Sequence, residues 1–260
     1  MKVSVIMGIY NCASYLKEAL DSLYAQTFQD FEIVLCEDGS PDATYEVARK
    51  YAENRSNIKL LRNETNKGLN YTLNRCLAEA EGEYIARMDG DDISLPDRFA
   101  TEVEFLDTHP EYAIVTTPMK HFDENGIFRI GKGGYEPDKK VFPKYSPFCH
   151  APCMVRKEAY LAVGGYTVSD RLLREEDYDL WIKMYQKGYR GYTLETPLYM
   201  MRDDRNAFKR RTFKARMNEA YVKHLAVKNL GLPFYYHINC LKPLILAITP
   251  EWLYRRLHNR

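Results

Sequence analysis

The first half of the chain alternates short, almost wholly apolar runs with longer segments in which apolar residues recur every three or four positions. The apolar runs predict strands over residues 3–10, 31–38, 58–62 and 83–89. The periodic segments between them predict helices over 12–26, 41–54 and 69–80. Repeated strand–helix order with nearly continuous apolar strands indicates an α/β fold, with a mostly parallel central sheet covered by helices on both faces.

Two of these helices carry sharper local predictions. In the first helix, the residues at helical spacing are expected to form its buried stripe, and they are Leu16, Ala19, Leu20 and Leu23. For the second helix, Ser40 is predicted as the N-cap and Pro41 as the first helical residue, because both residue types favour helix starts.

The second half follows the same pattern less regularly. We expect helices over 96–109 and 174–188, strands over 113–122 and 153–157, and a hairpin that turns at 123–126. Residues 131–147 are rich in Gly, Pro and Lys, which predicts a mobile loop over the functional site.

Polar residues gather where the first four predicted strands end. They are Tyr10 and Asn11, Glu37 and Asp38, Asn66 to Gly68, and Asp89 to Asp92. Ligands of parallel sheets bind beyond the carboxyl ends of the strands, so these clusters predict one binding edge. Neither GxGxxG nor GxxxxGK[ST] follows the first strand, which argues against a dinucleotide or P-loop site.

The acidic run after the fourth strand has the clearest chemistry. Asp89, Asp91 and Asp92 repel one another unless a hard divalent cation lies among them, which indicates Mn²⁺ or Mg²⁺. A cation held by one or two carboxylates keeps positions open for phosphate oxygens, and this predicts a diphosphate-bearing substrate. The alternative is an acidic turn that caps the next helix, since Asp92 precedes Leu-Pro-Asp.

A second candidate carboxylate begins the helix predicted over 174–188. Asp177 shares helical spacing with Leu180, Trp181 and Met184, so its carboxyl is expected to be partly desolvated and able to act as a general base. Nearby acidic residues compete for this role, and they are Glu175, Glu176 and Asp179. Trp181 is expected in the core rather than against a sugar.

The net charge of +1 conceals an uneven distribution. From residue 205 to residue 260 there are 12 Lys and Arg but 2 Asp and Glu, so this tail is strongly basic. Residues 206–229 predict a basic helix. Residues 234–254 are apolar and aromatic, but the run is interrupted by Lys242, Pro243, Pro250 and Glu251, which argues against a membrane-spanning helix.

The tail therefore predicts a helix at an anionic membrane surface. A packing arm or a dimer contact is the alternative, and nucleic-acid binding is disfavoured because no recognised module is present. The N-terminus lacks the regions of a signal peptide, and six scattered cysteines are expected to be reduced thiols. We expect a cytoplasmic protein that associates peripherally with the inner face of the cell membrane.

The motifs, in their order, resemble those of the family 2 glycosyltransferases, which are inverting sugar transferases of the Rossmann-like GT-A fold. The motifs are SVIMGIYN, CEDGSPD (36–42), NKGLNYTLN (66–74), EYIARMDGDDISLPDRF (83–99), HAPCMVRKEAYLAVGGY (150–166) and EEDYDLW (175–181). The likeness implies a catalytic domain over 1–204, with a nucleotide-binding half near 1–100 and an acceptor half near 101–204, followed by the helical tail 205–260. It implies transfer from a nucleoside-diphosphate sugar, with a UDP-sugar favoured, to a hydroxyl of a glycan or lipid-linked acceptor in polysaccharide or cell-envelope synthesis.

The resemblance also implies roles for individual residues. Asp177 looks like the catalytic base with Glu176 beside it, and Asp91 looks like the metal-binding residue of the DxD motif. Asp89 would face the ribose and diphosphate close to the metal. The other residues expected at the nucleotide sugar are Asp38 at the base, and Tyr10, Asn11, Lys67 and Arg202 around the pocket. His150 is a further candidate at the acceptor or phosphate, with a structural role as the alternative.

Two departures from the family pattern bear on the expected type of glycosyltransferase and on its metal site. The QxxRW motif of processive synthases is absent, so a non-processive enzyme is expected. In place of an Arg-x-His after the last strand stand Arg202, Asp203, Asp204 and Arg205, of which Asp203 or Asp204 is a candidate substitute for the histidine. One base and one metal suffice for a single displacement with inversion. The rival hypotheses are a metal-dependent nucleotidyltransferase and a non-catalytic sugar-nucleotide binding module.

Overall fold

The computed structural model describes residues 1–203 and 212–249. Its main sheet has seven strands in the spatial order β10-β6-β9-β4-β1-β2-β3. β1 pairs in parallel with β2 and β4, and β2 pairs in parallel with β3, so the predicted parallel half is confirmed. These four strands are β1 (Val3–Ile9), β2 (Phe31–Asp38), β3 (Ile58–Asn63) and β4 (Tyr84–Arg87).

Three strands from the second half complete this sheet. β9 (Met154–Arg156) lies antiparallel between β4 and β6 (Ile114–Thr116), and β10 (Gly191–Thr193) pairs in parallel with β6 at the edge. The sheet is therefore mostly parallel, as predicted, with one reversed strand.

Helices cover both faces of the sheet. On one face, α1 and α4 bury Leu16, Leu20 and Phe99; on the other, α3 and α6 bury Leu73 and Trp181. All four predicted core positions of α1 are buried. The helices are α1 (Ala13–Tyr24), α2 (Thr44–Ala52), α3 (Leu69–Glu79), α4 (Arg98–Thr108), α5 (Lys157–Ala162) and α6 (Glu176–Gln186).

The predicted start of α2 is wrong by three residues, because Ser40 and Pro41 lie outside the helix. The Ser40 hydroxyl accepts a hydrogen bond from the backbone N–H of Asn11 (3.1 Å), so it holds the loop after β1 instead of capping. Asp42 instead accepts from the N–H of Thr44 (3.1 Å), an Asx-type turn that leads into the helix.

The strand predicted over 113–122 is two strands in different sheets. β6 ends at Thr116, and β7 (Met119–Asp123) joins a four-stranded sheet in the order β5-β11-β7-β8. Pro118 separates them, and it has no N–H to donate to a ladder. The hairpin between β7 and β8 (Gly126–Ile130) is confirmed, with Asp123 opposite Gly126. The other members are β5 (Ile93–Ser94) and β11 (Tyr199–Arg202).

Segment 131–147 is irregular, as predicted, apart from a 3₁₀ turn, η1 (Lys139–Val141). It is fastened at two points: Tyr135 exchanges backbone hydrogen bonds with Thr193, and the Phe142 side chain is fully buried. The segment is thus anchored on both sides of its η1 turn.

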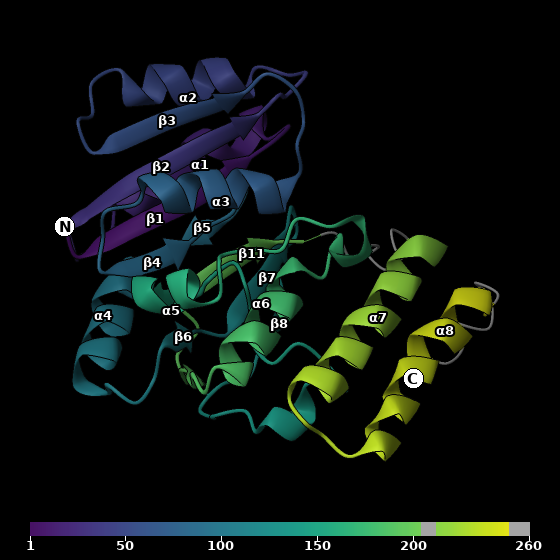
Figure 1. The fold of residues 1–260 in the computed structure, drawn as a ribbon. Coiled ribbons are helices and arrows are strands. Elements are labelled where there is room, and N and C mark those ends of the chain that lie inside the picture. Colours follow the sequence, from purple (N-terminus) through teal and green to yellow (C-terminus); the bar gives the residue numbers. More distant parts are fainter. Residues whose placement is uncertain (204–211, 250–260) are drawn as a thin grey trace.

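The C-terminal part begins with α7 (Phe213–Asn229), which lies beside α8 (Leu241–Ile248) at one end of the molecule (Figure 1). α7 contributes Val222 and Ala226 to the core that contains Trp181, and its Asn218 amide donates to the carbonyl of Asp170 (3.1 Å). α7 therefore packs against the same core as α6. The turn η4 (Phe234–Cys240) joins it to α8. The predicted boundary at 204/205, and the tail beyond Thr249, lie outside the described residues.

Candidate active site

The carboxyl ends of β1 and β4 enclose a cavity of about 210 Å³. Its lining brings together four of the predicted residues, namely Tyr10, Asn11, Asp89 and Asp91. Asn11 has φ +51°, a left-handed conformation that is uncommon outside glycine and often marks functional sites. Gly90 allows the loop after β4 to approach α1, because a Cβ there would lie 2.8 Å from the Cys12 sulfur.

Asp89 is held by an arginine that sequence reasoning missed. The Arg87 guanidinium donates to both carboxylate oxygens, with Nη1 3.0 Å from Oδ2 and Nη2 2.5 Å from Oδ1. The Arg87 side chain is buried, and Asp89 is partly exposed at the cavity. The signal was present in the sequence, since a charged residue inside an apolar strand requires a partner nearby.

Asp91 and Asp92 have different environments. Burial, and next the charge of Asp89, raise the pKa of Asp91 above its ordinary value, and no side chain among residues 1–203 and 212–249 donates a hydrogen bond to its carboxylate. Asp92 is 2% exposed and accepts from the N–H of Arg202 (2.8 Å), so it ties the acidic loop to β11. The N-cap position of α4 is Asp97, without a side-chain capping bond. Helix capping therefore does not explain the acidic run.

Asp177 lies in the first turn of α6, as predicted. Burial, and next the charge of Glu176, raise its pKa from 3.8 to about 7, although its side chain keeps some contact with solvent. The Ser146 hydroxyl donates to Asp177 Oδ2 at 3.4 Å, which brings the end of segment 131–147 to the site. Burial also raises the pKa of Glu176. The charge of Arg87 acts to lower this pKa and the charge of Asp89 to raise it, so α6 begins within electrostatic reach of the Arg87–Asp89 pair.

Trp181 belongs to the core, as expected. Its side chain is fully buried and packs edge-to-face with Phe148 at 5.7 Å between ring centroids. The helical spacing that identified Asp177 thus places Trp181 in the interior one turn further along α6.

Two predicted nucleotide-site residues have structural partners. Asp38 is 4% exposed and accepts from the N–H of Lys67 (2.8 Å) and of Gly68 (2.9 Å), so it holds the loop between β3 and α3. The Lys67 side chain is exposed. A direct contact of Asp38 or Lys67 with a nucleotide is untested and stays a prediction.

Arg202 acts as a clamp on the acidic loop. Its Nε donates to the carbonyl of Asp91 (3.0 Å) and its Nη2 to Glu18 (2.6 Å), while the guanidinium lies 4.3 Å from the ring centroid of Tyr15. Arg202 thereby links β11, α1 and the loop after β4.

His150, and Asp203 as the candidate substitute for the family's histidine, bond to residues outside the cavity lining. His150 Nε2 lies 2.8 Å from the Tyr166 hydroxyl, and burial, with the charge of Arg87, holds its pKa well below the ordinary value, so the ring is neutral. Asp203 lies 3.2 Å from His121 Nδ1 and 3.5 Å from Arg129 in the second sheet. In the described part of the chain, no three His, Cys, Asp or Glu side chains gather as a preformed metal cage.

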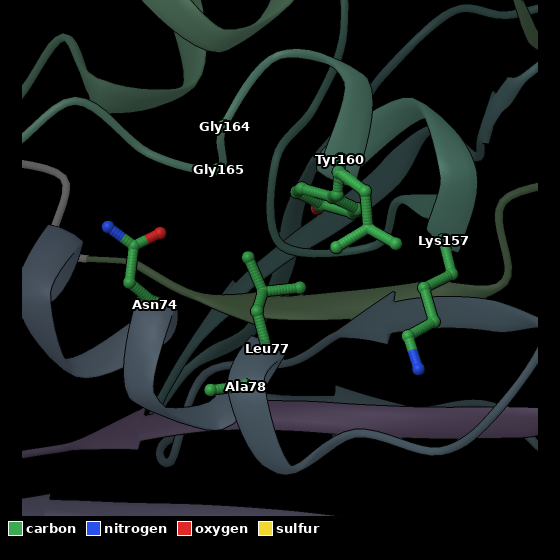
Figure 2. A pocket seen from close by; sticks show the side chains of 8 residues that line it. Asn74, Leu77, Ala78, Lys157, Tyr160, Gly164 and Gly165 are labelled. Atoms are coloured by element: carbon green, nitrogen blue, oxygen red, sulfur yellow. The ribbon is translucent and has the colours of Figure 1, made fainter.

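A second hollow, of about 390 Å³, lies between α3 and α5 (Figure 2). Its polar groups are already used: the Lys157 amine donates to the carbonyl of Ala80 (2.7 Å), and the Asn74 amide bonds the backbone of Tyr166 through both of its ends (2.8 Å each). Its lining contains no carboxylate. The β1–β4 cavity, which has carboxylates, is the better candidate site.

Comparison with known sequences agrees with this geometry. The chain matches the family described as Glycosyl transferase family 2 over residues 4–164. EpsE from Bacillus subtilis (strain 168), a relative named for glycosyltransferase activity, is 43% identical over 260 residues, which cover 100% of this chain and 94% of EpsE. The UDP-Gal:alpha-D-GlcNAc-diphosphoundecaprenol beta-1,3-galactosyltransferase of Escherichia coli is 30% identical over 224 residues, 81% of this chain and 77% of that relative.

Solved structures share the fold. TarS 1-349 from S. aureus gives a TM-score of 0.73 at 23% identity, covering 95% of this chain and 72% of that one. Its complex with UDP-GlcNAc gives 0.69 at 21% identity, covering 96% and 82%. The mannosyltransferase PcManGT from Pyrobaculum calidifontis, in complex with GDP-Man and Mn²⁺, gives 0.68 at 18% identity, covering 99% and 79%.

The fold is the GT-A fold of glycosyltransferases. The chain belongs to glycosyl transferase family 2.

Proposed function

We propose that this glycosyltransferase moves a sugar from a nucleoside-diphosphate sugar to an acceptor hydroxyl by a single displacement that inverts the anomeric centre. The observation that carries the proposal is the Asp177 carboxyl, whose burial raises its pKa to about 7, at the start of α6. A general base is most effective when its pKa lies near the operating pH. Asp177 would take the proton of the attacking hydroxyl, and the charge of Glu176 would keep the Asp177 pKa high.

A divalent cation fits the residues of the β1–β4 cavity. No side chain of the described residues donates a hydrogen bond to the Asp91 carboxylate, and its raised pKa reflects burial and the nearby Asp89 charge, both of which a cation would offset. A single free carboxylate matches the way Mg²⁺ or Mn²⁺ is shared between protein and substrate phosphates. When bound, the cation would stabilise charge on the departing diphosphate. Asp89, already held on both oxygens by Arg87, would orient the donor beside it.

The donor would enter beside the exposed Tyr10 and Asn11 side chains. Its base would lie toward the loop of Lys67 and Gly68, which Asp38 holds, and its diphosphate toward Asp91. Arg202 would keep the acidic loop in position. TarS was solved with UDP and with UDP-GlcNAc, and the Escherichia coli relative is named for a UDP-sugar, whereas PcManGT was solved with GDP-Man. A UDP-sugar is therefore the favoured donor, with Mn²⁺ or Mg²⁺ as cofactor.

A lipid-linked or glycan acceptor is supported by the same Escherichia coli relative, whose name specifies a diphosphoundecaprenol-linked sugar. An acceptor on a lipid requires the enzyme at a membrane surface. No helix in the described chain is long and apolar enough to span a bilayer, so peripheral binding is the proposed mode.

The surface of η4 and α8 supports peripheral binding. Large apolar side chains stand exposed there, and they are Phe234, Tyr235, Ile238, Leu241 and Ile245. Basic residues accompany this apolar stripe, including Lys228 and Lys242. An aromatic and aliphatic face flanked by lysines suits the interface of an anionic bilayer.

Substitution within the apolar stripe tests membrane binding. We expect the Phe234→Ser/Ile238→Ser double variant to lose at least about ten-fold in affinity for vesicles that contain phosphatidylglycerol, because each large side chain contributes roughly 1.5–3 kcal/mol when buried. Leu161→Ser, an exposed leucine on α5, is the matched control and should bind as the unmodified protein does. Co-sedimentation measures both, and equal binding by the double variant would contradict the proposal.

A nucleotide screen tests the donor site. We expect UDP with Mn²⁺ to raise the melting temperature, because a ligand of the folded state stabilises it, by about 2.7 kcal/mol at a hundred times its Kd. GDP, dTDP and CMP are the comparison ligands. Transfer from the matching sugar nucleotide should then release a nucleoside diphosphate; release of pyrophosphate would identify a nucleotidyltransferase instead, and binding without any transfer would identify a binding module.

A further inference from the structure

Arg87 is a buried cation at the carboxyl end of β4, and it is paired with Asp89 of the candidate site. Ile85 of this strand belongs to the core beneath α3 and α6, while Ala86 belongs to the opposite core. Because side chains alternate along a strand, Arg87 projects to the same face as Ile85, toward α6. Its side chain is about 95% buried, with 5% exposed.

The backbone of Arg87 is fixed from both sides. Its N–H donates to the carbonyl of Cys153, the residue before β9 (2.9 Å), and its carbonyl accepts from Nη2 of Arg98 (2.9 Å). The Arg87 side chain therefore extends from a backbone that is hydrogen-bonded on both sides, and its guanidinium forms a two-point pair with Asp89. This geometry fixes the plane of the carboxylate, which a single-point contact does not do.

One N–H group of this guanidinium makes no hydrogen bond within the described residues. Nε of Arg87 has no hydrogen-bond partner within residues 1–203 and 212–249. A buried N–H without an acceptor costs free energy, roughly 1–3 kcal/mol. A buried arginine that leaves this cost uncompensated is poorly explained by stability alone.

The charge of Arg87 also reaches the first turn of α6. Burial raises the pKa of Asp177 and of Glu176, and in both cases the Arg87 charge opposes that rise. The same cation thus contacts the donor-side carboxylate directly and acts through space on the proposed base.

We propose that Arg87 is a positioning residue for the transfer reaction: its guanidinium fixes Asp89 at the donor cavity, and its charge favours the ionised form of the carboxylates that begin α6. The inference rests on the proposed function. It joins two segments of the site that are about 90 residues apart in the chain, the β4 loop and the start of α6.

The sign of the pH effect follows from the groups around Asp177. The groups that face it are Glu176 and Tyr178 on α6, Arg87 on β4, Ser146 and Cys149 in the segment before β9, and Tyr166 after α5. Removing the positive charge of Arg87 raises the pKa of Asp177 above about 7, where burial already places it. Because the base acts when ionised, the acid limb of the pH–rate profile moves to higher pH.

Two variants of the full chain separate geometry from charge. Arg87→Gln removes the charge, and we expect its acid limb to move up by about 0.5 to 1 pH unit. Arg87→Lys keeps the charge but loses the two-point pair, so we expect an unmoved limb and a donor KM about ten-fold higher. Arg156→Lys on β9 is the matched control, because that arginine donates to the carbonyls of Tyr112 and Leu106 far from the cavity.

The opposing outcome is specific. If both Arg87 variants keep the acid limb and donor KM of the unmodified enzyme and lose only melting temperature, as Arg156→Lys should, Arg87 is structural and the proposal is overturned. If Arg87→Gln fails to fold, Arg87→Lys decides through its donor KM, and an unchanged value overturns the proposal.

A titration without turnover distinguishes this inference from the proposed function. The ¹³C carboxyl resonance of Asp177, assigned by its loss in Asp177→Asn, should titrate at higher pH in Arg87→Gln than in the unmodified protein. That shift in a protein that transfers no sugar would sustain the electrostatic link while refuting the function. Identical midpoints would overturn the link even in an active enzyme.

Discussion

Asp177→Asn should reduce the transfer rate by roughly a hundred- to ten-thousand-fold, the range that loss of a general base produces. The amide keeps the size of the carboxyl but cannot accept the proton of the acceptor hydroxyl. In the unmodified enzyme the rate should fall as pH drops below about 7, because burial raises the Asp177 pKa to that value and the protonated acid is inactive. Initial rates between about pH 5 and 9 measure both effects.

The same substitution should stabilise the fold at alkaline pH. The folded-state pKa of Asp177 lies above its ordinary value of 3.8, so its stabilising contribution is complete below 3.8 and is lost as pH rises through about 7. The neutral asparagine suffers no such loss. Melting temperature at alkaline pH should therefore rise by at least about 2 °C, and the gain should shrink as pH falls.

Asp170→Asn is the matched control for Asp177→Asn. Asp170 precedes α6 with a side chain that is 96% exposed, so its amide variant should keep the rate, acid limb and melting temperature of the unmodified enzyme. An Asp177→Asn enzyme that retains more than about a tenth of the activity would exclude Asp177 as the base and make Glu176 the next residue to test.

Asp91→Asn is expected to abolish the Mn²⁺-dependent part of UDP binding. The variant loses the cavity carboxylate to which no side chain of the described residues donates, and with it the charge that would hold the cation. A cation at the leaving group contributes several kcal/mol, so transfer should fall by about a hundred-fold or more. Thermal shift with UDP, with and without Mn²⁺, measures binding independently of transfer.

Asp97→Asn controls for loss of one negative charge near the acidic loop, because Asp97 is exposed at the start of α4. It should leave the metal-dependent shift intact. A full Mn²⁺-dependent shift in Asp91→Asn would show that the cation, if bound, is held elsewhere.

Local patterns in the chain were sufficient for the first half of the fold. Apolar runs and helical spacing identified β1 to β4 and α1 to α3, and the parallel order then implied that the strand ends meet at one edge. That inference predicted one binding edge from four polar clusters, and residues of the first and the fourth, namely Tyr10, Asn11, Asp89 and Asp91, line the cavity. It succeeds because periodicity and strand ends are properties of neighbouring residues.

Partnerships between distant residues could not be predicted in this way. Whether Ser40 caps a helix or binds Asn11 depends on a contact across 29 positions, and whether Asp38 faces a nucleotide or holds Lys67 depends on another across 29. The break of 113–122 into two sheets depends on the pairing of β7 with β11, from the far end of the domain. Each polar group has several possible partners, and packing alone selects among them.

The amino-acid sequence itself encodes an α/β sheet with an acidic edge, the stripe that buries Trp181, and the position of Asp177 at a helix start. The folded chain adds the electrostatics: Arg87 against Asp89, Glu176 beside Asp177, and a raised pKa for the proposed base. The reason is physical, since spacing along the chain determines which face a side chain occupies, whereas its charge state and partners depend on desolvation and on groups that only tertiary packing brings near.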